Sequence, residues 1–383
     1  MKILGFGTYR AASHPRVAVL LEGLARRGHT VRELNEPLRS STSERVAALR
    51  SPRGAAAFFG QLGSSWLRLI AGAQRYRTSP PDVVVVGYLG HFDVVLARLL
   101  FPKSTIVLDH LIFAADTAKD RGANSALLGR ALEALDRLAH ACADLVVYDT
   151  PDHALMAPAG QHRKGIVVPV GAPEQWLSAG QAARAAHTEG PEGAAEIKSA
   201  DAHGSGAAEA RSVIFYGLFT PLQGTPTIAR ALRLLHERGQ LPPVTLVGTG
   251  QDEAQVREIL GDTPVTWLDW VESNELPDLV ASHDISLGIV GTTPKGRRVV
   301  PNKVYQSMAA GCAVITSDTP SQREILGSAV RYVAPGDAEG LAEAIAELAG
   351  NGELCAEYQR RALQLSATAL RPEQVVSPLA ARL

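Results

Sequence analysis

Long apolar runs, paired cysteines and an excess of charge of one sign are all missing from this chain of 383 residues. Its three cysteines, Cys142, Cys312 and Cys355, lie far apart and form no CxxC pair, so a disulfide framework and a cysteine-based zinc site are excluded. The formal net charge of -1 provides no general field that would attract nucleic acid or an anionic membrane. We therefore expect a protein of a reducing compartment that has no nucleic-acid partner.

No segment approaches the roughly 20 consecutive apolar residues of a membrane span, and the opening MKILGFG is too short for the centre of a signal peptide. We therefore expect a cytoplasmic protein with no transmembrane segment. Residues 44–77 combine arginines with Phe58, Phe59, Trp66 and Leu69. This pattern favours two core-facing helices, because the polar face is not basic throughout; a peripheral membrane contact is the less favoured alternative.

Several catalytic signatures are also absent. The chain has no GxxxxGK[ST] phosphate loop, no GxSxG elbow and no DxD pair, and its histidines show neither HxH nor HExxH spacing. The stretch GFGTYR supplies Gly5 and Gly7, but Arg10 stands where a dinucleotide-binding motif has its last glycine. We therefore predict that the protein has no metal site and requires no cofactor.

What the sequence does contain is a regular alternation of buried strands and amphipathic helices. Val- and Ile-rich runs, typical of strands buried on both faces, occur in the first half at residues 3–6, 83–86, 106–109, 143–150 and 165–173 and in the second at 212–219, 243–250, 265–271, 284–291, 312–318 and 330–333. Helical patterns separate these runs, and this arrangement indicates doubly wound parallel sheets. We predict an α/β protein with two tandem Rossmann-like domains facing a central cleft.

The predicted domain boundaries follow from composition. Residues 1–175 form the first domain and residues 213–360 the second. Residues 176–212 are rich in Ala, Gly, Ser and charge and poor in large apolar side chains, so they are predicted to be a low-complexity linker or insertion. Residues 361–383 are predicted to be a helical tail that packs back on the first domain.

The order of several segments resembles the GT-B glycosyltransferases, specifically the retaining family 4. The segments that carry this resemblance are YGLFTPLQGTPTIARAL (216–232), VTLVGTGQ (244–251), VTWLDWVESNELPDLVASHDISL (265–287), PNKVYQSMAAGCAVITSDTPSQREIL (301–326) and VAPGDAEGLAEAIAEL (333–348). GLARRGHTV and HFDVVLARLL in the first half fit more loosely. The resemblance implies a glycosyltransferase that retains the anomeric configuration, with a donor-binding second domain and an acceptor-binding first domain.

The donor implied by the resemblance is a UDP, GDP or dTDP sugar, used without a metal. A helix that begins at about Asn302 can hold a diphosphate through its first backbone amides, and the preceding loop supplies cations that would stabilise the leaving group. The residues predicted to bind the donor are Gly217, Gly248, Trp270, Val271, Lys295, Arg297, Asn302, Gln306 and Glu324. His110, Lys303 and Arg298 are predicted to be catalytic. For His110 the resemblance implies a contact with the donor sugar.

This sequence departs from the family at a pair of glutamates that many members carry with seven residues between them. Gln306 stands at the second position, and a gap-free count places Arg298 at the first. Two alternatives therefore stay open beside transfer: a sugar-nucleotide epimerase on the same frame, and a non-catalytic paralogue that binds a nucleotide sugar.

The acceptor is predicted to be a small natural product or glycan precursor, bound by polar residues that follow strands of the first domain. These residues are His14, Arg16, Asp109, Asp116, Asp120 and Arg121. A salt-bridged helix start is the alternative for the DTAKDR stretch. The sequence does not determine the oligomeric state.

Overall fold

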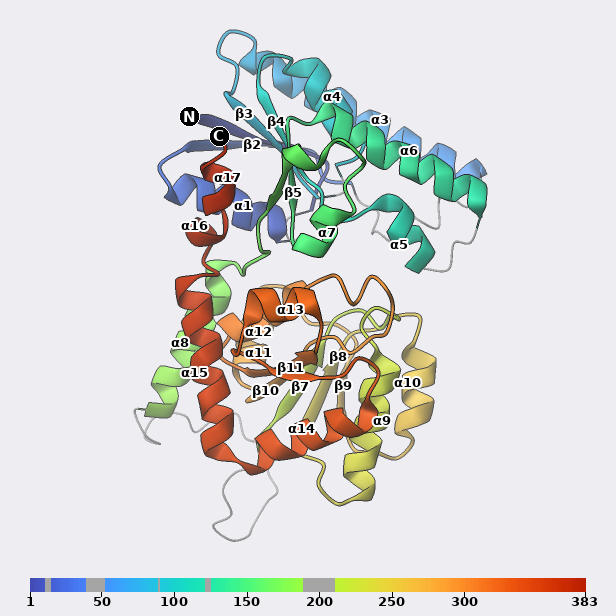
Figure 1. Ribbon diagram of the computed structural model, residues 1–383, viewed down its shortest axis with the longest axis vertical. Coiled ribbons are helices and arrows are strands. Elements are labelled where there is room, and N and C mark those ends of the chain that lie inside the picture. The colour runs from blue at the N-terminus through green and yellow to red at the C-terminus, as the bar shows by residue number, and fades with distance from the viewer. Residues whose placement is uncertain (11–14, 39–51, 89, 121–124, 189–210) are drawn as a thin grey trace. The chain divides into compact units, whose positions relative to one another are not determined.

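The computed structural model describes residues 1–10, 15–38, 52–88, 90–120, 125–188 and 211–383 (Figure 1). It divides into two compact units. The first consists of Met1–Gly171, Arg298–Val300 and Leu370–Leu383, and the second consists of Ala172–Arg297 and Pro301–Ala369. Each unit contains one six-stranded sheet.

The sheet of the first unit is parallel throughout and has the strand order β2-β1-β3-β4-β5-β6. Its strands are β1 (Lys2–Gly7), β2 (Thr30–Asn35), β3 (Val83–Val86), β4 (Thr105–Asp109), β5 (Leu145–Tyr148) and β6 (Gly165–Val167). The four valines of β3 are all buried, as expected for a central strand covered on both faces. The strand order reverses between β1 and β3, so the loops after these two strands define the switch point.

The helices of the first unit connect these strands and cover the sheet (Figure 1). They are α1 (Arg16–Arg26), α3 (Pro52–Ala73), α4 (Asp93–Leu100), α5 (Ala114–Asp120), α6 (Ala126–Cys142) and α7 (Pro151–Leu155), with short 3-10 turns at Gln74–Tyr76 and His162–Lys164. The expected helix pair in residues 44–77 is wrong within the described part, because Pro52–Ala73 is a single helix. Its Phe58, Leu62 and Leu69 are buried, which fits the core-facing interpretation.

The sheet of the second unit is also parallel, with the order β12-β11-β10-β7-β8-β9. Its strands are β7 (Val213–Tyr216), β8 (Val244–Val247), β9 (Thr266–Leu268), β10 (Ile285–Leu287), β11 (Ala313–Ser317) and β12 (Arg331–Val333). This is the order of a dinucleotide-binding Rossmann sheet, and the order reverses between β7 and β10. The predicted class, two Rossmann-like α/β domains in tandem, is confirmed.

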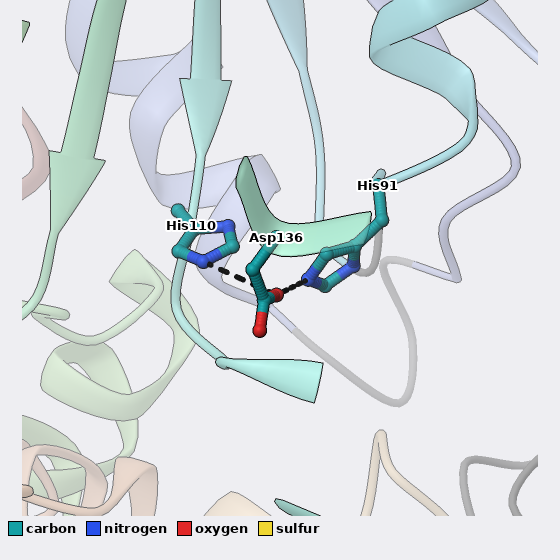
Figure 2. Close-up of side chains that lie close together, drawn as sticks. All are labelled: His91, His110 and Asp136. Atoms are coloured by element: carbon teal, nitrogen blue, oxygen red, sulfur yellow. Dashed lines mark ion pairs between the residues drawn. The ribbon is translucent and has the colours of Figure 1, made fainter. Parts of the chain in front are cut away.

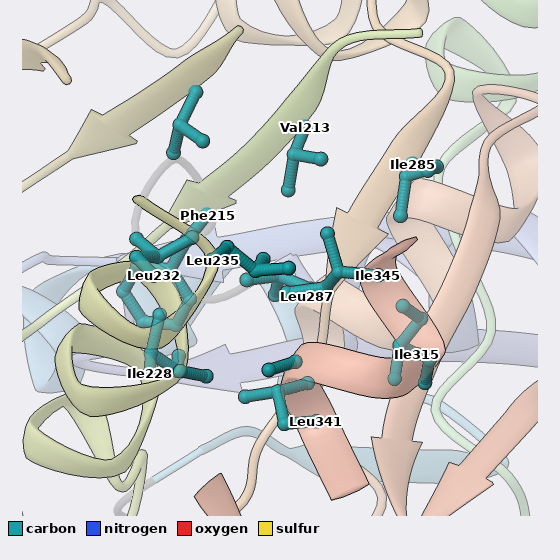
Figure 3. Packing of buried hydrophobic residues seen from close by; sticks show 14 of the residues in the cluster. Val213, Phe215, Ile228, Leu232, Leu235, Ile285, Leu287, Ile315, Leu341 and Ile345 are labelled. Carbon is teal, nitrogen blue, oxygen red and sulfur yellow. The ribbon is translucent and has the colours of Figure 1, made fainter. Parts of the chain in front are cut away.

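The helices of the second unit pack on both faces of its sheet. They are α8 (Glu174–Thr188), α9 (Thr225–Glu237), α10 (Glu253–Leu260), α11 (Leu276–Ala281), α12 (Asn302–Ala309), α13 (Pro320–Leu326), α14 (Ala338–Gly350) and α15 (Gly352–Thr368). Side chains of α9, α10 and α14 interlock with one face of the sheet, and Figure 3 shows Leu232, Leu235 and Ile345 meeting Phe215 and Leu287 there.

Two segments of the predicted linker and tail take a definite place. Residues 174–188 form the helix α8, which includes the predicted low-complexity linker from residue 176 onward, and Trp176 is buried. Residues 189–210 lie outside the described residues. The C-terminal helices α16 (Pro372–Val375) and α17 (Ser377–Ala380) belong to the first unit. There α16 packs on α1 so closely that a Cβ atom on Gly23 would lie 2.1 Å from the carbonyl oxygen of Pro372.

Among the helices that the structure describes, none combines the length and the apolar character that a membrane crossing requires.

Candidate active site

In the second unit, the loops after β7, β8 and β10 meet backbone to backbone at the carboxyl end of the sheet. A Cβ atom on Gly224 would lie 2.5 Å from the nitrogen of Gly291, and one on Gly248 would lie 2.1 Å from the carbonyl oxygen of Gly217. Gly217 and Gly248 also have φ values of 135° and 125°, which other residues rarely adopt. These contacts bring the loops together at the switch point of the sheet, where doubly wound folds bind their ligands.

The side chain of Lys303 lies at this end of the sheet, beside the loop that follows β7. It lies in the first turn of α12, is 6% exposed, and its Nζ lies 3.6 Å from the centroid of the Phe215 ring. A Cβ atom on Gly217 would lie 3.0 Å from this Nζ, so the ammonium group lies beside the backbone that follows β7. Within the described residues, Nζ has no hydrogen-bond partner. Burial lowers the pKa of Lys303 well below its usual 10.5, because desolvation disfavours the charged form.

Hydroxyl groups of the neighbouring strands hydrogen-bond to the first turns of α12. The hydroxyl of Tyr216 donates a hydrogen bond of 3.0 Å to the carbonyl oxygen of Lys303 and lies 3.0 Å from Oγ of Ser307. The hydroxyls of Ser286 and Ser307 are 2.6 Å apart. On its other side, the ring of Tyr216 stacks on Trp176 with 5.9 Å between the centroids. The start of α12 is therefore fixed to β7 and β10, which limits how far Lys303 can move.

The other residues predicted to bind the donor lie in the second unit, at different depths. Asn302 and Gln306 are half-buried in α12, while Glu324 is exposed on α13. Trp270, just after β9, is 74% exposed, and its indole N–H donates a hydrogen bond of 3.1 Å to Glu272. The remaining three, Val271 (half-buried), Lys295 (half-buried) and Arg297 (exposed), lie in loops. These residues stay predictions, whereas Lys303 has a defined and unusual environment.

Two of the predicted acceptor residues, Arg16 and Asp109, are buried in the first unit. The side chains of Arg16 and Asp109 are completely buried, and Nε of Arg16 lies 3.2 Å from Oδ1 of Asp109. The guanidinium group of Arg16 also donates to the backbone carbonyls of Val168 and Pro169. Burial raises the pKa of Asp109, and Arg16 acts against this shift. The pair joins α1 to β4 and to the segment after β6; the acceptor-binding role of both residues stays a prediction.

Asp116 and Arg298 also pair within the first unit. Nη2 of Arg298 lies 2.7 Å from Oδ1 of Asp116, and Thr150 donates a hydrogen bond of 2.7 Å to the carbonyl oxygen of Arg298. Arg298 thus belongs to the first unit, whereas Lys303 belongs to the second. Asp116 lines a groove of about 760 Å³ between α5, α6 and the segment after α7, together with Phe113, Lys119, Glu133, Asp136, Arg137 and Met156, among others.

His110 follows β4, where the resemblance places it, and its ring is enclosed. The residue is 2% exposed, and its ring centroid lies 4.3 Å from that of His140 and 5.0 Å from that of His91. Its Nε2 faces Oδ1 of Asp136 at 3.7 Å. Burial, followed by the neighbouring histidines, lowers the pKa of His110 well below 6.5, so the ring is neutral at physiological pH. Its predicted catalytic role, in contact with a donor sugar, stays a prediction.

Three predicted acceptor residues cannot be placed. His14 and Arg121 lie outside the described residues, as does the side chain of Asp120.

The sequence reasoning missed four residues that the structure brings to these places. Tyr216 and Trp176 support the start of α12, and His91 and Asp136 flank His110. Tyr216 carried a usable signal, because it is the last residue of a buried strand that runs into a glycine loop. Asp136 carried none, since it occupies an ordinary position inside a helical pattern.

Comparison with known proteins agrees with this arrangement. Residues 210–351 match the family model described as glycosyl transferases group 1. The chain is 31% identical over 168 residues to a phosphatidyl-myo-inositol mannosyltransferase of Mycolicibacterium smegmatis. That match covers 40% of this chain and 40% of the relative, so the aligned part spans about two fifths of the curated relative's length.

Solved structures match over the whole chain. Anabaena HepE in complex with UDP-glucose has a TM-score of 0.64 at 15% identity, with 100% of both chains covered. Sucrose-phosphate synthase from Thermosynechococcus elongatus has a TM-score of 0.67 at 14% identity, with 100% of this chain and 98% of that chain covered. The chain therefore has the GT-B fold of these glycosyltransferases. The segment that matches the group 1 glycosyltransferase model, residues 210–351, lies in the second unit apart from Arg298–Val300.

Proposed function

We propose that this chain is a retaining glycosyltransferase that moves a sugar from a nucleoside-diphosphate sugar to an acceptor. The observation that carries the proposal is the buried ammonium group of Lys303, which lies in the first turn of α12 without a hydrogen-bond partner among the described residues. A buried cation without a partner is costly, and a bound anion removes that cost. The site therefore suits the diphosphate of a donor.

Lys303 and the start of α12 offer complementary interactions to such a diphosphate. Pro301 precedes the helix and gives it no side-chain cap. The N–H of Val304 donates to the carbonyl oxygen of Pro301, so the amides of Asn302 and Lys303 are the ones that we propose bind an anion. Gly217 leaves the space beside Nζ open, because it has no side chain to fill it. As the bond to the sugar breaks, negative charge grows on the leaving diphosphate. A preorganised cation and helix dipole stabilise that charge more than they stabilise the bound donor.

This arrangement leads us to propose that no Mg²⁺ or Mn²⁺ is needed at the diphosphate. The positive charge that a metal would supply comes instead from Lys303, with Lys295 and Arg297 of the preceding loop as further cations. For the donor we propose a UDP sugar first, since HepE was solved with UDP-glucose. GDP and dTDP sugars are the competing donors.

The acceptor is proposed to bind in the groove of the first unit, between α5 and α6. The groove combines the apolar Phe113 and Met156 with the charged Lys119, Glu133 and Arg137. Its volume of about 760 Å³ is in the range of pockets that enclose a small organic molecule. A small natural product or glycan precursor with both apolar and hydroxyl-bearing parts fits such walls. We propose that the protein acts in the cytoplasm.

Gln306 favours a second candidate, a protein that binds a nucleotide sugar without transferring it. A neutral amide can still bind ribose or sugar hydroxyls, but it lacks the charge of the family's glutamate. Release of free nucleoside diphosphate separates the two functions. We would incubate the chain with UDP-glucose and pools of small acceptors, without divalent metal, and follow UDP and product mass by mass spectrometry.

A glycosyltransferase forms a product heavier by one sugar in step with free UDP, and the anomeric proton signal of that product reports retention. Nucleotide binding with no UDP released from any donor would instead support the non-catalytic protein. Interconversion of two sugar nucleotides without an acceptor would support an epimerase.

A further inference from the structure

Three buried side chains of the first unit, from three different elements, converge on one point. His91 lies in the loop between β3 and α4, His110 follows β4, and Asp136 lies in α6. Their exposed fractions are 5%, 2% and 5%. One ligand-type atom from each residue lies within 4.8 Å of the other two. Figure 2 shows both imidazole rings directed at the same carboxylate.

The facing atoms of this cluster lie close together but make no hydrogen bonds with one another. Oδ1 of Asp136 lies 3.0 Å from Nε2 of His91 and 3.7 Å from Nε2 of His110. Yet neither Nε2 makes a hydrogen bond within the described residues. Buried polar atoms are nearly always bonded, so two such nitrogens facing one oxygen need an explanation. A cation at their common point would satisfy all three ligand atoms at once.

A supporting shell holds the ligand groups in place. Oδ1 of Asp136 accepts a hydrogen bond of 3.0 Å from the backbone N–H of Ala114, at the start of α5. His140 lies against the ring of His110, but both of its nitrogens are engaged: Nδ1 with the carbonyl oxygen of Asp136 at 2.7 Å, and Nε2 with the hydroxyl of Tyr148 at 2.8 Å. Such outer contacts orient metal ligands in known sites. They also exclude His140 from the ligand set.

We propose that His91, His110 and Asp136 bind one divalent transition-metal ion of the Zn²⁺ class. Two imidazoles and one carboxylate suit Zn²⁺ and its neighbours, whereas Mg²⁺ and Ca²⁺ prefer ligand sets made of oxygen alone. Three protein ligands leave a position for water or another small ligand, as in open zinc sites. Asp136 also lines the groove between α5 and α6, which gives the ion a route to the site.

This site would revise two expectations drawn from the sequence. The spacing of the histidines along the chain predicted no metal, but 18 intervening residues between His91 and His110 do not prevent their rings from meeting after adjacent strands. His110 would act as a metal ligand instead of contacting a donor sugar. The proposed diphosphate site belongs to the second unit and uses none of His91, His110 and Asp136.

The test uses the full chain without an affinity tag. Metal is removed with a chelator and the chelator is then dialysed away. Zn²⁺ is next titrated in competition with a chromophoric indicator, and Co²⁺ loading is followed by its visible absorption. We expect one Zn²⁺ per chain and a rise in unfolding temperature on binding. His91→Gln and Asp136→Asn should each weaken Zn²⁺ binding by roughly 100-fold or more, since even loss of an outer-shell contact costs 10–100-fold.

His283→Gln is the matched control. His283 is a histidine of the second unit whose two nitrogens are both engaged, with Leu279 and Thr245, so its loss should leave Zn²⁺ binding unchanged. Circular dichroism verifies that each variant is folded, and Asn at position 136 keeps an oxygen that can accept from Ala114. The proposal is overturned if the wild type takes up no stoichiometric Zn²⁺, or if the folded ligand variants bind it as tightly as the wild type does. Neither result would affect nucleotide binding at Lys303.

Discussion

The ammonium nitrogen of Lys303 lies 3.6 Å from the centre of the Phe215 ring, in a residue that is only 6% exposed. A cation–π contact of this kind contributes about 0.5–2 kcal/mol, which is less than the cost of removing an ammonium group from water. In the free protein, the ammonium group of Lys303 therefore lacks an anionic partner within the described part of the chain. The diphosphate of a donor would be that partner, as proposed for the start of α12.

Nucleotide binding should be accompanied by proton uptake. Burial lowers the pKa of Lys303 well below 10.5 in the free protein, and a diphosphate placed beside Nζ raises it again. Between these two pKa values, binding takes up a proton, so affinity falls as pH rises from the pKa of the free protein towards that of the complex and levels off above it. Calorimetry of one nucleotide in two buffers of different ionisation enthalpy measures this uptake. Equal apparent enthalpies in both buffers, at every pH tested, would contradict the prediction.

The same shift predicts how the free protein responds to pH. Because the unfolded lysine keeps its proton up to about 10.5 while the folded one loses it earlier, the unfolded chain binds more protons in between. The contribution of Lys303 to the free energy of unfolding therefore rises with pH over this window, which lies below 10.5. Urea unfolding of the wild type and of Lys303→Met as pH is raised isolates the contribution. A difference between the two that is independent of pH would contradict it.

Gly248→Ala should destabilise the second unit and disturb the proposed nucleotide site. The added Cβ atom would lie 2.1 Å from the carbonyl oxygen of Gly217, and the φ of 125° is unfavourable for alanine. We expect a loss of about 2–4 kcal/mol, combining backbone strain with overpacking. Gly239→Ala is the control, since its φ of 66° carries strain but nothing lies within 4 Å of the added atom. Urea denaturation should give the control a loss of only about 1 kcal/mol; equal losses would argue against the clash.

Arg16→Met should destabilise the first unit strongly. The substitution leaves the carboxylate of Asp109 buried without its cation, and breaking a buried ion pair in this way costs about 3–5 kcal/mol. Arg26→Met is the comparison, because Arg26 pairs with Glu22 on a partly exposed face and such pairs contribute at most about 1 kcal/mol. Unfolding of both variants in urea decides between them. A small loss in the free energy of unfolding for Arg16→Met, together with weaker acceptor binding, would contradict this prediction and support an acceptor-binding role for Arg16.

Local sequence pattern was sufficient for most of the strands and for the start of α12. The run Val83–Val86 is apolar at every position and forms a central strand. Likewise Asn302, behind a proline, begins a helix as predicted. These features depend on neighbouring residues in the chain, which is why periodicity and turn chemistry could find them.

The roles of individual polar side chains depend on contacts that local pattern does not contain. Arg16 and Asp109 both lie near the carboxyl ends of strands in the first domain, where site residues and buried ion pairs look alike in sequence. Only the structure, with 3.2 Å between Nε of Arg16 and Oδ1 of Asp109, identifies a buried ion pair. Asp136 meets His91 across 44 intervening residues, because α6 packs against α4. No spacing rule for metal ligands covers such a separation.

The most direct measurement is a calorimetric titration of UDP, GDP and dTDP into the wild type, Lys303→Met and Lys103→Met, without divalent metal. Lys103 is exposed in the first unit, so its variant controls for loss of a lysine. We predict that one nucleoside diphosphate binds the wild type and Lys103→Met equally. Lys303→Met should bind it roughly 10–100-fold more weakly, the equivalent of one charged hydrogen bond, and should unfold at an equal or higher temperature. Equal binding to all three proteins, or no binding to any, would contradict the proposed diphosphate site.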